Sequence, residues 1–85
     1  MTTHYDDRLL ILDLGGKPLT VEYVGGMRET FIGVADLTLW VHTQTNQPAY
    51  SLFPVRPPIL TFNRGTTQPL ENVVRIEDWE ELNAS

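Results

Sequence analysis

Residues 19–34 read LTVEYVGGMRETFIGV, and this stretch decides the fold. Its first five residues alternate apolar and polar side chains, which is the period of a strand with one buried face. The pair Gly25-Gly26 follows, and glycines supply the positive backbone φ angles that a tight hairpin turn requires. The chain then returns along residues 28–34, with Gly33 placed for a bulge or bend. The stretch therefore predicts a β-hairpin.

Strand patterns also lie on both sides of this hairpin. Residues 9–12 form a short apolar run, followed by Asp13-Leu14 and a turn at Gly15-Gly16, which is typical of a strand buried on both faces. After a break at Ala35-Asp36, residues 37–43 alternate again, so that Leu37, Leu39 and Val41 share one face and Thr38, Trp40 and His42 share the other. We expect further strands over 49–55, 59–62 and 73–76, polar loops over 44–48 and 63–69, a helical turn at 70–72, and a strand extension or short helix over 77–82.

Short strands that follow one another at intervals of about ten residues are typical of small barrels and sandwiches. No segment shows the apolar period of a long helix. The sequence predicts an all-β fold, a small barrel of five to seven strands of the SH3-like or Sm-like kind, with one short helical turn. We expect one domain over residues 1–85, with flexible ends at 1–7 and 83–85.

The composition of the chain indicates in which cellular compartment the protein is expected. The chain has 85 residues, 41% of them hydrophobic, which suffices for one core. It contains no cysteine, which fits a reducing compartment. No apolar run approaches the length of a membrane span, and the first eight residues are polar and acidic, unlike a secretory signal. We therefore expect a cytoplasmic protein that does not bind membranes.

Charge excludes one class of partner. Eleven acidic residues against six basic ones give a net charge of −5. Proteins that bind nucleic acids use a surplus of Lys and Arg to displace counterions from phosphates. Direct nucleic-acid binding is therefore not expected. Lys17 is the only lysine, and arginines suit fixed, bidentate or stacked contacts better than lysines do.

A pattern of glycines and apolar residues runs through the hairpin and beyond it. Its residues are Gly16-Lys17, Val21-Glu22-Tyr23, Gly26, Phe31-Ile32-Gly33 and Ala35-Asp36, and they cover about a quarter of the chain. The pattern is similar to the first motif of the Sm-like family of small barrels, and Arg64-Gly65 resembles the Arg-Gly pair of the second motif. Two departures matter. Leu37-Thr38-Leu39 stands where the family has its RNA-contacting Asn, and about 20 residues follow Arg64-Gly65 although that motif lies near the end of the family's fold. The resemblance implies a barrel and ring-like assembly, without the family's RNA binding.

An acidic segment near the C-terminus is the strongest interaction signal. It contains Glu71, Glu77, Asp78, Trp79, Glu80 and Glu81. Tryptophans are enriched in binding hot spots, and carboxylates around one would attract a basic surface. We therefore expect a non-enzymatic protein-binding module that engages a basic partner surface, with Asp6 and Asp7 as further contacts. Such a module would be a regulator, an adaptor, or a phage-type inhibitor that imitates the charge of nucleic acid. In the alternative interpretation the segment is a solvated tail, and Trp79 fills the mouth of the barrel.

The arginines suggest a second hypothesis, a homo-oligomeric binder of a small ligand or nucleotide with pockets between subunits. Such pockets would be lined by Arg28, Arg56, Arg64, Trp40 and Tyr50. Small barrels with open strand edges often cover them by pairing with a neighbouring subunit, so a homo-oligomer is expected under this hypothesis.

Catalytic and metal motifs give no support for an enzyme. Ser51 has no Gly-x-Ser-x-Gly setting, and His42 has no nucleophile near it in the sequence. Asp6, Asp7 and Asp13 lack the Gly and Glu of a dedicated calcium loop. We predict no catalytic residue, no metal site and no cofactor.

Overall fold

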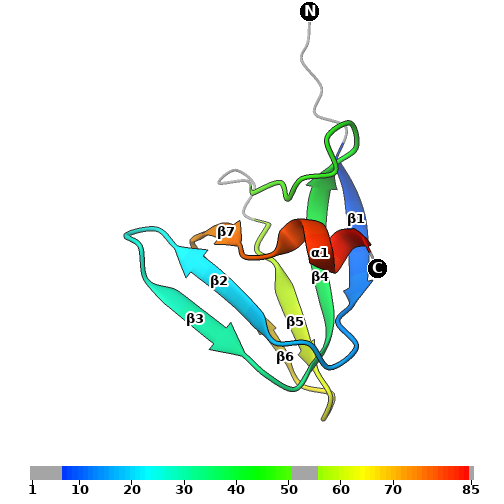
Figure 1. The fold of residues 1–85 in the computed structure, drawn as a ribbon, viewed down its shortest axis with the longest axis vertical. Helices are drawn as coiled ribbons and strands as arrows, with labels where there is room; N and C mark the ends of the chain where they lie inside the picture. Colours follow the sequence, from blue (N-terminus) through cyan, green and yellow to red (C-terminus); the bar gives the residue numbers. More distant parts are fainter. Residues whose placement is uncertain (1–6, 51–55, 85) are drawn as a thin grey trace, which may run out of the picture.

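Two antiparallel sheets and one short helix make up the fold (Figure 1). The computed structural model describes residues 7–50 and 56–84. The elements are β1 (Asp7–Asp13), β2 (Leu19–Tyr23), β3 (Arg28–Phe31), β4 (Val34–His42), β5 (Ile59–Phe62), β6 (Thr67–Pro69), β7 (Val73–Ile76) and α1 (Trp79–Ala84). The prediction of a mostly β domain is confirmed. Among the described strands, no ladder joins the two sheets into a closed barrel.

The central hairpin forms as the sequence predicts. β2 pairs with β3, and Gly25 and Gly26 at the turn have φ angles of 97° and 92°. The second sheet has the order β3-β2-β7, and the first has the order β1-β4-β5-β6. The chain passes from one sheet to the other at Gly33, whose φ of 71° is the predicted bend.

β4 is the longest strand and forms the centre of the first sheet. Leu37, Leu39 and Val41 are buried on its inner face, as the alternation predicts. The predicted break at Ala35-Asp36 is wrong, because β4 begins at Val34 and runs through these residues. A register irregularity against β5 lies there instead.

Both sheets contribute to one core. Its fully buried side chains include Leu19 and Val21 from β2, Leu37 from β4 and Leu60 from β5. Trp79 and Leu82 of α1 belong to the same cluster, so the helix closes the core with its apolar side. No helix in the described part of the chain has both the length and the apolarity needed to cross a bilayer.

β1 differs from its prediction. The apolar run indicated a strand buried on both faces, but 53% of Leu9 and 64% of Ile11 are exposed. The prediction is wrong because only one face of β1 lies against the core: Leu12 is buried there and Leu10 packs beside it, whereas Leu9 and Ile11 lie on the outer face. Asp7 begins this strand, and residues 1–6 lie outside the described part of the chain.

The second half of the chain also corrects several boundaries. β6 lies within the predicted polar loop 63–69, and residues 71–72 form a turn instead of a helical turn, with Asn72 at a φ of 66°. The strand predicted over 49–55 is absent from its described residues, Ala49 and Tyr50, and residues 51–55 lie outside the described part. The tail, left open between strand and helix, contains α1, which includes Asn83 and Ala84.

Candidate functional site

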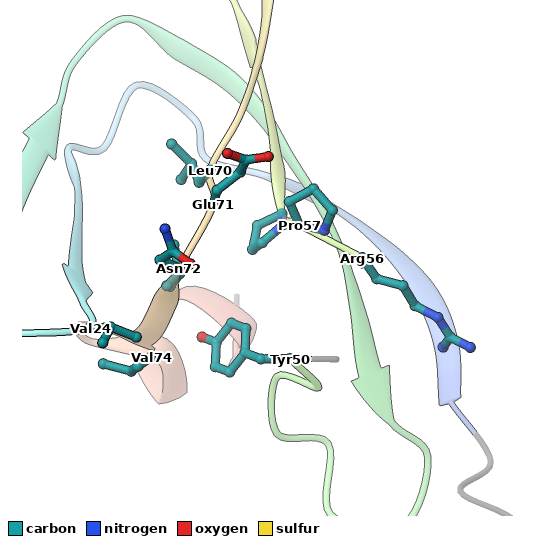
Figure 2. Close-up of a pocket in the computed structure, with 10 residues that line it drawn as sticks. Val24, Tyr50, Arg56, Pro57, Leu70, Glu71, Asn72 and Val74 are labelled. Carbon is teal, nitrogen blue, oxygen red and sulfur yellow. The ribbon is translucent and has the colours of Figure 1, made fainter. Parts of the chain in front are cut away.

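A pocket of about 550 Å³ lies where separate segments of the chain meet beside β7 (Figure 2). Val24 from the hairpin, Tyr50, residues 56–58 and residues 70–74 form its walls. This volume and the mainly apolar lining are typical of sites that receive small ligands or anchoring side chains.

Backbone hydrogen bonds fix the walls of this pocket. The Leu70 N–H donates to the carbonyl oxygen of Pro58 at 2.8 Å, and the Val24 N–H donates to that of Asn72 at 2.8 Å. Pro58 and the preceding Pro57 hold their φ angles near −65° through their rings. These bonds tie the wall at residues 70–72 to Pro58 and to Val24.

Three exposed apolar side chains surround the opening. The exposed fractions are 68% for Val24, 47% for Val74 and 37% for Tyr50. Clustered apolar groups on a surface mark an interaction site more often than scattered ones do. Partial burial raises the pKa of Tyr50 above its ordinary value of 10, and the neutral hydroxyl can donate a hydrogen bond.

The charge presented at the pocket is negative. Figure 2 shows the Arg56 guanidinium directed away from the pocket toward β1. It lies 3.2 Å from a carboxylate oxygen of Asp7 and 4.6 Å from the ring centre of Trp40. Glu71, at the opposite wall, is exposed and forms no ion pair with another described residue. A cationic group therefore fits this opening better than an anionic one.

Two further hollows lie between the pocket and α1. Tyr50 and Val74 also border a second hollow of about 330 Å³, which extends to Trp79. Trp79 in turn borders a third hollow of about 290 Å³, which reaches Glu80 and Asn83. Neighbouring hollows share lining residues, so the three lie next to one another, and together they are called here the groove.

An ion-pair network lies beside the groove. Arg75, which borders the second hollow, lies 3.3 Å from Glu22 and 3.5 Å from Glu77. Arg28 lies 3.9 Å from the same two carboxylates. The two arginines and two glutamates therefore balance one another, and Glu77 is not a free acidic group.

The predicted partner-binding residues have different environments. Trp79 is only 6% exposed and lies in the core, which does not fit an exposed anchor residue. Asp78, Glu80 and Glu81 are exposed at the start of α1, and Glu80 reaches the groove. Glu71 lies at the other end of the groove. Asp7, the described one of the two N-terminal acids, pairs with His42 and Arg56.

The five residues of the second hypothesis are not brought together. Tyr50 and Arg56 both line the pocket. Trp40 does not line it, and its ring lies beneath the Arg56 guanidinium, which points away from the pocket. Arg28 belongs to the ion-pair network, and Arg64 lies 5.7 Å from the ring centre of Phe62.

Sequence reasoning identified Glu71 in the 70–73 wall but missed its neighbours Leu70, Asn72 and Val73, and it also missed Val24 and Val74. One signal for Val74 was available, because alternation along a strand places one residue of the Val73-Val74 pair on the outer face. Comparisons of the chain with protein-family models, with curated protein sequences and with solved structures gave no significant match.

Proposed function

We propose that this chain is a non-enzymatic protein-binding module that holds an extended basic segment of a partner protein in the groove. The observation that carries the proposal is the groove itself, which has one mainly apolar pocket, two more polar hollows, and the exposed carboxylates of Glu71 in the pocket and Glu80 in the third hollow. Such a module acts as a regulator, an adaptor or an inhibitor.

Each part of the groove has a role in this proposal. The pocket between Val24 and Val74 receives an apolar anchor side chain, since burial of such a group supplies most of the affinity at an interface. Glu71 and Glu80 attract Lys or Arg residues on either side of the anchor. The net charge of −5 speeds the approach of a basic partner.

A small ligand is the second candidate, and the pocket volume favours it. The pocket lies within one chain, so this function needs no neighbouring subunit. Its nearest guanidinium, that of Arg56, is already paired with Asp7, and the exposed charge belongs to Glu71. These charges favour a cationic or neutral ligand over a nucleotide.

For the architecture, we propose that the two sheets form an open barrel of the SH3-like or Sm-like kind. The direct passage from β3 to β4 at Gly33 and the common core support this proposal. An experimental structure of the whole chain, compared strand by strand with those barrels, tests it.

Fluorescence anisotropy with labelled peptides tests the binding function. The peptides carry one apolar residue between two arginines, and a matched set carries glutamates in place of the arginines. We expect only the basic set to bind, and we expect Glu71→Lys and Glu80→Lys each to weaken binding roughly tenfold through lost rim attraction.

The control is Glu81→Lys, which makes the same charge change at an exposed residue of α1 that borders none of the three hollows. If all three variants bind with the same affinity, net charge and not the groove governs binding. If neither peptide set binds while a neutral apolar compound does, the small-ligand function replaces the proposed one.

A further inference from the structure

Arg56 lines the pocket, but its charge is held outside it. The guanidinium lies 3.2 Å from a carboxylate oxygen of Asp7 and 4.6 Å from the ring centre of Trp40. Figure 2 shows this side chain directed away from the other residues that line the pocket. Two contacts, one with a carboxylate and one with an aromatic face, therefore determine where this positive charge lies.

Asp7 is well placed to hold the guanidinium. It begins β1 directly opposite His42 of β4 in the register, and its second carboxylate oxygen lies 3.0 Å from Nδ1 of His42. The Asp7 side chain is only 14% exposed, so water competes weakly for its carboxylate. Because each oxygen has its own partner, the carboxylate has a fixed orientation toward Arg56.

Glu71 is the alternative partner for Arg56. Both residues line the same pocket, and Glu71 is exposed and forms no ion pair with another described residue. The Arg56 side chain is 32% exposed, and an arginine has several rotatable bonds, so it can turn into the pocket once Asp7 no longer holds it. Its charge would then balance that of Glu71, and a cationic ligand group would meet a neutral pocket.

We propose that Asp7 determines the preference of the pocket for cationic groups, although it does not line the pocket itself. Asp7 is a positioning residue, because it holds the Arg56 charge away from the pocket and thereby leaves Glu71 to the Lys or Arg of a partner. This inference rests on the proposed function, since it names the residue that keeps the acidic group of that site available.

Fluorescence anisotropy with the arginine-containing peptides tests the inference on four proteins: the natural sequence, Asp7→Asn, Arg56→Gln and the double variant. We expect Asp7→Asn to weaken binding roughly two- to fivefold, which is the range for one exposed ion pair between Arg56 and Glu71. Arg56→Gln should bind at least as tightly as the natural sequence. The double variant should also regain at least the natural affinity, because no guanidinium remains to balance Glu71.

A merely structural role of Asp7 would not be cancelled by removing Arg56. A double variant that binds as weakly as Asp7→Asn would therefore overturn the proposal, and so would an Asp7→Asn variant with unchanged affinity. Circular dichroism confirms that each variant is folded.

The matched control is Asp36→Asn, which removes the same charge at the other end of β4, opposite Asp13. It should bind the peptides as the natural sequence does. Equal weakening by Asp36→Asn and Asp7→Asn would assign the effect to net charge and would also overturn the proposal.

Nuclear magnetic resonance of the ligand-free chain separates this inference from the proposed function. In the natural sequence we expect nuclear Overhauser contacts between the Arg56 side chain and the Trp40 ring. In Asp7→Asn these contacts should give way to contacts between Arg56 and Glu71, and their persistence would overturn the proposal. If Arg56 moves in this way but the natural sequence binds no basic peptide, the control of Arg56 by Asp7 is supported and only the proposed function fails.

Discussion

The indole N–H of Trp79 donates a hydrogen bond to the backbone carbonyl oxygen of Asn46 over 2.9 Å. Trp79 begins α1, and Asn46 lies in the loop that follows β4, so this bond fastens the helix to the first sheet. The side-chain oxygen of Asn46 also accepts a hydrogen bond from Arg8 of β1. One loop residue thus connects the two ends of the described chain.

Trp79→Phe should lower the free energy of unfolding by about 1–3 kcal/mol, because it leaves the Asn46 carbonyl without its donor and reduces the buried surface. Trp79→Ala should cost about 3–5 kcal/mol through the cavity it leaves. Urea unfolding followed by circular dichroism measures both. A Trp79→Phe variant as stable as the natural sequence would show that water replaces the indole at no cost.

The sequence was informative where structure depends on neighbouring residues. Alternation and the glycine pair identified the β2–β3 hairpin, and alternation identified the buried face of β4. The exposure of Leu9 and Ile11 depends on which elements pack against β1 in the fold. An apolar run looks the same in the sequence whether one face of its strand is covered or both. The burial of Trp79 depends on contact with a loop 33 residues away. The pocket could not be predicted for the same reason, since its walls come from segments separated along the chain.

Asp7→Asn should lower the free energy of unfolding by about 1.5–3 kcal/mol. The partial exposure of Arg56 favours the lower end of this range. The Asp7 carboxylate bonds both His42 and Arg56 and is itself only 14% exposed, so its loss leaves a partly buried guanidinium without a counter-charge. Glu80→Gln removes the same charge from an exposed position and serves as the control. Equal stability of the two variants, measured by thermal unfolding, would contradict a structural role for Asp7.

Gly26→Ala should destabilise the hairpin by about 1–2 kcal/mol. A Cβ at this position would meet no atom within 4 Å, so the cost comes from the φ of 92° and not from a clash. Gly26→Asn should cost less, because Asn tolerates positive φ better than Ala does. Urea unfolding of the two variants gives this order, and the reverse order would mean that the turn changes its conformation to accept alanine.

Alkaline pH should destabilise the fold in part through Tyr23. Its hydroxyl donates a hydrogen bond to a carboxylate oxygen of Glu29 at 2.7 Å. Desolvation, followed by the hydrogen bond and the negative charge of Glu29, raises the pKa of Tyr23 from 10 to about 12. Since the neutral phenol is favoured in the folded state, its contribution is complete below pH 10 and is lost as the pH rises through about 12.

Tyr23→Phe removes this titration. Its free energy of unfolding should therefore fall less steeply than that of the natural sequence between pH 10 and about 12. Tyr50 remains in both proteins, and its raised pKa contributes a fall of the same sign to each, so the difference between the two slopes belongs to Tyr23. Urea unfolding at a series of alkaline pH values measures the slopes. Ultraviolet titration of tyrosinate in the folded proteins checks the pKa directly, and parallel slopes would mean that Tyr23 titrates alike in the folded and unfolded chain.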